Sequence, residues 1–269
     1  MSLELNCGPL ELPEPAPAGA LAAARHVLKR QWLYWYLGCA VVLMILAGGT
    51  STGSATALAN AEPPILMGFA VILVLGTLLG ISASGWSGKT DAGADGKAYP
   101  RRALQGCAGI VLTGLGLVLL IDLGTLALSP YLRQASPAIF LQYVTMSISI
   151  LLLQVGMGFC FGSVLPGILA LPISLVLLVG AYFEPGRRLA AALPDALHVD
   201  RLAIAVLDLV APQSGMLYGG SLGTALRYHL PYAEVLRCFY YQAAYGAVYL
   251  MCGLCLHRLL RSSFPKREL

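Results

Sequence analysis

Charged residues are scarce in this sequence: Asp, Glu, Lys and Arg make up 11% of its 269 residues, whereas hydrophobic residues make up 58%. A soluble globular domain carries about 25% charged residues. Most of the chain therefore has no aqueous surroundings to face. This shortage argues against an ordinary soluble domain and predicts an integral membrane protein.

An excess of positive charge is also missing. The formal net charge is +4, and the basic residues fall between apolar blocks and do not form one stripe. Nucleic-acid binding relies on a concentrated basic surface. We therefore expect no nucleic-acid partner.

Catalytic and metal-binding patterns are lacking as well. The four histidines are scattered, and no HExxH or GxSxG motif is present. Cys252 and Cys255 form a CxxC pair, but no second pair or histidine cluster accompanies it at the spacing of a zinc site. We expect this pair to pack as small apolar side chains, and we expect no metal, no cofactor and no enzymatic activity in this chain.

Long apolar runs dominate what is present. A membrane-spanning helix needs about 20 apolar residues, and about six segments meet or approach that length. They lie near 33–50, 64–84, 103–128, 138–161, 164–183 and 236–257. The sequence thus predicts an all-α polytopic membrane protein with about six transmembrane helices, in which GSVLPG forms a tight turn between the fourth and fifth.

The segments between and beside these runs complete the expected organisation. Residues 1–32 form a cytosolic tail and an amphipathic segment, 33–257 the transmembrane domain, and 258–269 a basic cytosolic tail. Residues 85–102 form a cytosolic loop, and 184–235 form a long external connection. Within that connection, 198–210 has the spacing of an amphipathic helix on the membrane surface, or of an ordinary loop helix.

Lysine and arginine counts predict the orientation. With both termini in the cytosol, eleven of these residues fall in inner segments and six in outer ones, and five of those six lie in the long connection. Charges far from the helix ends have little influence on topology. We therefore expect both termini to be cytosolic.

The stretch ASGWSGKT, residues 83–90, fits a loose form of the phosphate-binding P-loop pattern. A working P-loop joins a buried strand to the start of a helix. Here the preceding apolar run is too long for a strand, and DAGADGKAYP follows with two glycines and a proline. Asp122, which would have to serve as the magnesium-binding aspartate, lies within an apolar run expected to cross the membrane. We interpret the pattern as a chance match.

Polar residues within the expected spans are functional candidates because they are costly in a bilayer. Asp122 is the clearest, and four interpretations are open: it pairs with a neighbouring helix, lines a pathway, lies near the outer interface, or is protonated. Gln142 and Gln154 on the fourth segment are expected to form interhelical hydrogen bonds. Glycines on the third segment are expected to allow close helix approach; they are Gly109, Gly114 and Gly116.

Three regions share features with one family of membrane proteins. ARHVLKRQWLYWYLG precedes the first span as an amphipathic segment, and GKAYPRRALQGCAGIVLTGLG leads into the third. The tail beginning at HLPYAEVLRC contains the last span and ends in aromatic, basic, acidic and apolar residues. Together these regions resemble the permease subunit of a type-2 ABC transporter, the group that includes the permease of the nitrous-oxide-reductase maturation system. One departure is the glycine-rich KTDAGADGK, where many relatives have an acidic-Gly-Thr element.

The resemblance implies a permease in the cytoplasmic (inner) membrane that binds no ATP itself. Its implied partners are a dimeric ABC ATPase subunit, a second permease copy or a homologous permease, and membrane lipid. The ATPase-coupling residues that it implies are Asp91, Asp95, Lys97, Pro100, Arg101 and Arg102.

Three other interpretations stay open at this point. The 85–102 segment is also consistent with a solvated loop that obeys the positive-inside rule. The chain as a whole is also consistent with a membrane scaffold or assembly factor, or with an ion-coupled secondary transporter. An ATPase partner would distinguish the permease from both, and dependence on an ion gradient would identify the secondary transporter.

Overall fold

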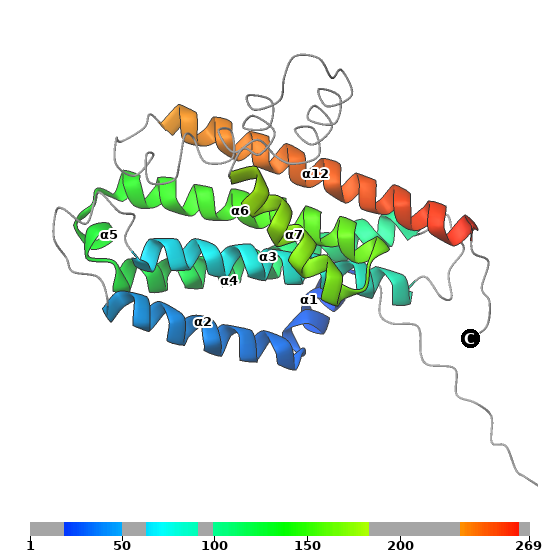
Figure 1. The fold of residues 1–269 in the computed structure, drawn as a ribbon, viewed down its shortest axis with the longest axis horizontal. Helices are drawn as coiled ribbons and strands as arrows, with labels where there is room; N and C mark the ends of the chain where they lie inside the picture. The colour runs from blue at the N-terminus through cyan, green and yellow to red at the C-terminus, as the bar shows by residue number, and fades with distance from the viewer. Residues whose placement is uncertain (1–18, 50–62, 91–98, 183–231, 264–269) are drawn as a thin grey trace, which may run out of the picture.

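The computed structural model of the chain describes residues 19–49, 63–90, 99–182 and 232–263, and every regular element among them is an α-helix. Figure 1 shows the helices as a bundle of elongated rods. In chain order they are α1 (Ala20–Leu28), α2 (Gln31–Gly49), α3 (Pro63–Thr90), α4 (Tyr99–Leu128), α5 (Pro130–Gln134), α6 (Pro137–Val164), α7 (Gly167–Tyr182) and α12 (Tyr232–Ser263).

The all-α membrane architecture expected from the sequence is confirmed. Four of the described helices are long and apolar enough to cross a bilayer: α2, α3, α4 and α6. The apolar helix α7 is shorter, at 16 residues. Helix α12 has 32 residues, but Arg237, Gln242 and several tyrosines make it more polar. The described ends of the chain, α1 and the C-terminal end of α12, lie toward the same end of the bundle (Figure 1).

Helix α6 forms the centre of the bundle and packs between α3 and α12. Glycine pairs bring these backbones together. A Cβ atom on Gly156 of α6 would overlap the backbone of Gly246 on α12, and one on Gly158 would overlap the backbone of Thr77 on α3. Small residues allow this close approach, which membrane helices use in place of a hydrophobic driving force.

The structure distinguishes among the three glycines expected to allow close approach on α4. Gly109 meets the backbone of Ala20, and Gly114 meets the side chains of Leu79 and Leu151. Gly116 has no atom within 4 Å of the position that its Cβ would take. The expectation was therefore wrong for Gly116, which lies on the exposed face of the helix.

The connection between α3 and α4 is shorter than the expected 85–102 loop. Helix α3 continues to Thr90, and α4 begins at Tyr99. A helical glycine costs only about 1 kcal/mol relative to alanine, and Gly85 and Gly88 do not end the helix. Trp86 packs against Gly106 on α4, and this contact holds the extension in place. Residues 91–98, which include Asp91, Asp95 and Lys97, lie outside the described residues.

The tight turn expected at GSVLPG is confirmed, because Leu165 and Pro166 alone separate α6 from α7. The Pro166 carbonyl accepts hydrogen bonds from the backbone N–H groups of Leu169 and Ala170. The short helix α5 was not expected. The Ser129 hydroxyl caps its start by accepting a hydrogen bond from the Leu132 N–H at 3.1 Å. The connection containing 198–210 and the two chain ends lie outside the described residues.

Candidate functional site

The amphipathic segment before the first span forms α1 and packs on α4 and α3. Ala23 and Val27 bury one face of α1, whereas Arg25 and Lys29 are exposed. Residues four apart share a helix face, and this spacing explains the division. The Tyr34 hydroxyl donates a hydrogen bond of 2.7 Å to the Leu28 carbonyl, and this bond fixes the corner between α1 and α2.

The contact between α1 and α4 is a backbone contact. A Cβ atom on Gly109 would overlap the carbonyl group of Ala20. Three residues before Gly109, Gly106 receives the indole ring of Trp86 from α3. These residues form what we call the α1 junction: Ala20, Ala23 and Val27 on α1, Trp86 on α3, and Gly106 and Gly109 on α4.

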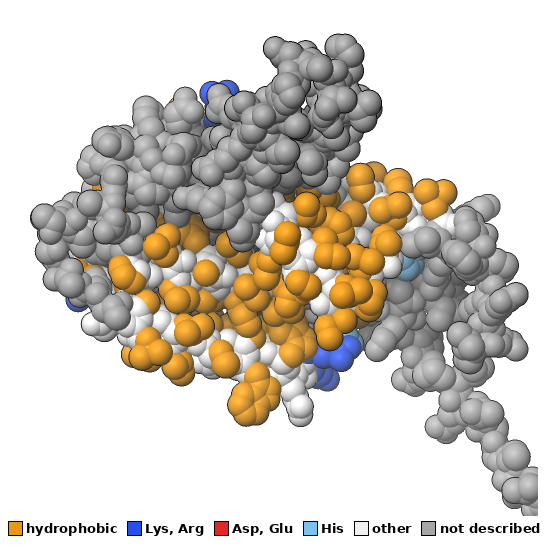
Figure 2. Space-filling model, in the orientation of Figure 1, with side chains coloured by type: hydrophobic (Ala, Val, Ile, Leu, Met, Phe, Trp, Pro, Cys, Tyr) orange, Lys and Arg blue, Asp and Glu red, His pale blue; other side chains and the backbone are white. Residues whose placement is uncertain are grey.

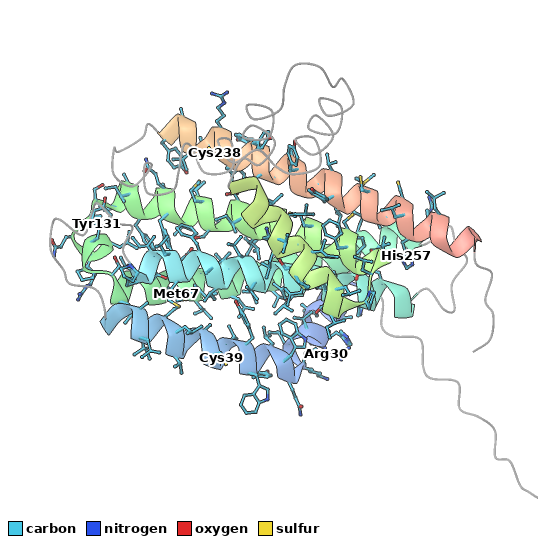
Figure 3. All side chains as sticks on the ribbon, viewed as in Figure 1. Arg30, Cys39, Met67, Tyr131, Cys238 and His257 are labelled. Atoms are coloured by element: carbon cyan, nitrogen blue, oxygen red, sulfur yellow. The ribbon has the colours of Figure 1, made fainter. Side chains whose placement is uncertain are left out.

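Basic side chains gather beside the α1 junction. Arg30 is hydrogen-bonded to His26 at 3.0 Å, and it is exposed together with Arg25 and Lys29. Figure 2 shows this basic group next to a surface of hydrophobic side chains. In Figure 3, Arg30 lies where α1 meets α2, His257 lies on the C-terminal part of α12, and Tyr131 marks the opposite end of the bundle.

The stretch ASGWSGKT forms the last turns of α3. Ala83 and Trp86 are buried, and the Ser87 hydroxyl donates a hydrogen bond of 2.9 Å to the Ala83 carbonyl. A P-loop presents free backbone N–H groups at the start of a helix, whereas these residues lie at the end of one. Of the other coupling candidates, Pro100, Arg101 and Arg102 lie in the first turn of α4, and their side chains are outside the described set.

Asp122 is fully buried between helices. The Ser147 hydroxyl of α6 donates a hydrogen bond of 2.9 Å to its Oδ1 atom. Asp122 Oδ2 and the Tyr143 hydroxyl have no hydrogen-bond partner among the described residues, although these two groups are close enough to interact electrostatically. The sequence predicted Asp122 as a candidate but not its neighbours Ser147 and Tyr143.

Gln154 makes the interhelical contact expected of it. Its side-chain amide lies 2.7 Å from the Thr77 hydroxyl of α3, and that hydroxyl also lies 3.0 Å from the Leu73 carbonyl. One hydroxyl hydrogen cannot serve both acceptors. An amide turned with its NH2 group toward Thr77 lets Thr77 donate to Leu73 and accept from Gln154. The amide oxygen would then take the place of Nε2, which lies 3.9 Å from the Met157 sulfur.

A second contact of the same kind joins α6 to α12. The Ser149 hydroxyl lies 2.6 Å from the Gln242 side-chain amide and 2.7 Å from the Met146 carbonyl. Gln242 was not among the candidates predicted from the sequence. Gln142, the remaining polar candidate, is partly buried on α6.

An apolar groove of about 260 Å³ separates α2 from α4. Its lining consists of Leu37, Ala40, Val41, Met44, Ile45, Leu117, Leu120, Ile121, Gly124 and Leu128. A wholly apolar groove suits an acyl chain and offers no hydrogen bond to a polar ligand.

The described residues contain no group of three or more His, Cys, Asp or Glu side chains arranged to hold a metal ion. Cys252 and Cys255 are exposed on α12 as free thiols. The two thiols are therefore not buried within the described bundle, and Cys252 lies close enough to Cys160 of α6 to interact with it electrostatically. No family model matches this chain, and neither a curated protein nor a solved structure is significantly similar to it.

Proposed function

We propose that this membrane protein is the permease subunit of a type-2 ABC transporter, which moves its substrate across the cytoplasmic membrane of a bacterium. A separate ATPase subunit would hydrolyse the ATP. The observation that carries the proposal is the α1 junction, because it ties the expected coupling segment to the peripheral helix α2 through close contacts.

In the proposed coupling, a displacement of the segment between α3 and α4 passes through α1 to α2. Residues 91–98 join α3 to α4, so that an ATPase pressing on this segment moves the adjoining ends of both helices. Trp86 and Gly106 hold these ends together, and Gly109 is in backbone contact with α1. Packed backbones do not slide freely past one another, so the displacement would pass to α1. Only Lys29 and Arg30 separate α1 from α2, and α2 would therefore follow.

The distribution of basic residues supports a cytosolic position for the coupling segment. Exposed basic residues cluster at the α1 junction, and Arg258 is exposed on the C-terminal part of α12, toward the same end of the bundle. Cytosolic ends of membrane proteins are rich in lysine and arginine. We therefore place both termini and the 91–98 segment in the cytosol.

The proposal assigns ATP hydrolysis to the partner. A helical ASGWSGKT segment has its backbone N–H groups engaged within α3 and does not offer them to phosphate. The complete transporter would contain an ATPase dimer and two permeases, either two copies of this chain or this chain with a homologous permease. Membrane lipid would cover the exposed face of α2 and fill the groove beside α4.

Gentle detergent purification of the tagged full-length chain from its native membrane tests the proposal, with mass spectrometry of the co-purifying proteins. We expect an ABC ATPase to accompany the chain, and we expect its loss when residues 91–98 are replaced by a neutral linker of equal length. Arg133→Gln, at the opposite end of the bundle, is the matched control and should retain the ATPase. A chain that emerges without an ATPase in every lipid and nucleotide condition would contradict the proposal.

The Asp122 region favours an ion-coupled secondary transporter as the second candidate. A buried carboxyl group with an unpartnered oxygen is the kind of group that such transporters use. Uptake into proteoliposomes that depends on an imposed ion gradient, with no ATPase present, would support this candidate. Independence from both ATP and an ion gradient would instead favour a scaffold or assembly factor.

A further inference from the structure

The carboxyl group of Asp122 lies inside the helix bundle without a basic partner. Its side chain is fully buried, and its partners among the described residues are Ser147, which donates the hydrogen bond to Oδ1, and Tyr143. Neither is a cation. An ionised carboxylate is strongly disfavoured in such surroundings unless a positive charge compensates it.

Oxygen atoms with free lone pairs surround this carboxyl group. The Ser147 hydroxyl donates its hydrogen to Asp122. The Thr125 hydroxyl, one helical turn from Asp122 on α4, donates its hydrogen to the Ile121 carbonyl at 2.9 Å. Both hydroxyl oxygens can still accept, and so can the buried Tyr143 hydroxyl oxygen, which lies close enough to Asp122, Thr125 and Ser147 to interact with all three.

Gly68 of α3 lies beside the same group of oxygen atoms. A Cβ atom there would lie 2.6 Å from the Tyr143 hydroxyl oxygen and 2.7 Å from Thr125 Oγ1. The two oxygens are therefore no more than about 5.3 Å apart, the sum of these two distances. Hydroxyl oxygens from α4 and α6 thus converge on the same stretch of α3 beside Asp122.

We propose that Asp122, Thr125, Tyr143 and Ser147 form a binding site for one small monovalent cation, either a proton or Na⁺. Carboxylate and hydroxyl oxygens are the ligands that hard cations prefer, and one positive charge neutralises the single buried carboxylate. Asp122 lies six residues before the end of α4 at Leu128, about 9 Å along the helix axis, and this places the site toward the α5 end of the bundle.

Among the described residues, the titratable group that interacts with Asp122 is Tyr143 of α6. The neighbouring residues of α3 are Gly68 and Phe69, and those of α2 are apolar. Helix α5, which also packs on α4, carries Tyr131 and Arg133. A dependence on pH or Na⁺ that is lost in Asp122→Asn would therefore report this carboxyl group together with Tyr143. The inference does not depend on the permease proposal, because binding is measured on this chain alone.

Two measurements on the purified full-length chain in lipid nanodiscs distinguish the two cations. For Na⁺, the thermal unfolding midpoint is followed as NaCl replaces choline chloride at constant ionic strength, because a ligand that binds the folded state raises this midpoint. For the proton, infrared difference spectroscopy across a pH series detects the carbonyl stretch of a protonated carboxylic acid.

Asp122→Asn is the main variant and is nearly isosteric. If the site binds Na⁺, we expect the Na⁺-dependent rise in the midpoint to be lost in Asp122→Asn and reduced in Thr125→Val, which removes one oxygen ligand. If the site binds a proton, we expect the carboxylic-acid band to disappear in Asp122→Asn, to shift in Ser147→Ala and to be insensitive to Na⁺.

Thr77→Val is the matched control, because it removes a buried hydroxyl at the α3–α6 interface away from Asp122. It should leave both signals unchanged. Should Asp122→Asn fail to fold, Thr125→Val and the band shift in Ser147→Ala still decide the result. A carboxylate that stays ionised throughout the pH series, with no Na⁺-specific rise in the midpoint, would overturn the proposal.

Discussion

Helices α6 and α2 are both predominantly apolar, yet they differ in how deeply the bundle buries them. In α6, 78% of the most apolar 18-residue stretch is buried in the bundle, compared with 22% of the corresponding stretch in α2. Helix α6 contacts α3 and α12 through glycine pairs and hydroxyl–amide hydrogen bonds. Helix α2 packs against its neighbours with one face only. The Tyr36 hydroxyl of α2 donates a hydrogen bond to the Val71 carbonyl of α3.

This difference shows that apolarity places a helix in the membrane but does not place it within the bundle. Lipid tails are as apolar as leucine, so hydrophobic burial gives no preference for the centre. Small residues that allow backbone contact, and polar groups that need partners, decide which helix lies inside. The most closely packed part of the described molecule is therefore α3–α6–α12, and we expect α2 to move more readily than these helices.

The largest expected effect is at the crossing of α6 and α12. Gly156→Ala places a methyl group against the Gly246 backbone, and because backbone cannot yield as a side chain does, we expect a loss of about 2–3 kcal/mol in stability. Gly38→Ala on α2 is the matched control, because nothing lies within 4 Å of its Cβ position. It should be neutral or slightly stabilising. Denaturant unfolding in mixed micelles would measure the loss of stability in each variant. Equal losses would contradict the proposed difference in packing between α6 and α2.

A smaller effect is expected at the hydrogen bond between α3 and α6. Thr77→Val keeps the side-chain volume but removes the partner of the Gln154 amide, and interhelical hydrogen bonds in membranes contribute about 0.6 kcal/mol, rarely more than about 1.7. We expect a loss of about 1 kcal/mol, because the Gln154 amide stays buried. The double variant with Gln154→Leu should recover part of this loss. Additive losses would indicate that the two residues are not coupled.

The anchor of α2 should contribute less. Tyr36→Phe removes the hydrogen bond to the Val71 carbonyl with little change in packing, and we expect a loss of about 0.5 kcal/mol. Hydrogen exchange of the α2 amides should rise while exchange in α6 stays the same, because α2 would loosen alone. An equal rise in both helices would show that α2 and α6 unfold as one unit.

The smallest effect is expected on the outer face of α2. Leu46 is 62% exposed in the bundle, and its side chain would face lipid. Leu46→Ala should change the stability in micelles by no more than about 0.5 kcal/mol. A loss comparable with that of Gly156→Ala would instead show that this face is covered by another protein chain.

Much of the fold could be predicted from the sequence. Each apolar run forms a helix whose ends lie within six residues of the expected bounds, because length and hydropathy are local properties. Asp122 was also identifiable, since a lone acidic residue in an apolar run stands out. The end of α3 was not, because the contact between Trp86 and Gly106 that supports it joins two helices.

The partners of the polar residues could not be predicted. Hydroxyl groups in apolar helices commonly bond to the carbonyl one turn earlier. The presence of Thr77, Ser147 and Ser149 in apolar runs therefore does not predict a contact with another helix. Their functional partners are set by which helices pack together. The contact of Gln242 could not be predicted for the same reason, because it depends on the position of Ser149 on another helix.

The central claim, that an ATPase drives this chain through the α1 junction, is tested most directly by the ATPase activity of the purified complex. Gly109→Ala introduces a methyl group between α4 and Ala20, and Gly116→Ala introduces one on the same helix where nothing lies within 4 Å. The account predicts that Gly109→Ala keeps the ATPase bound but abolishes the effect of the permease on its rate, while Gly116→Ala matches the unaltered chain. Identical rates in the two variants would contradict it.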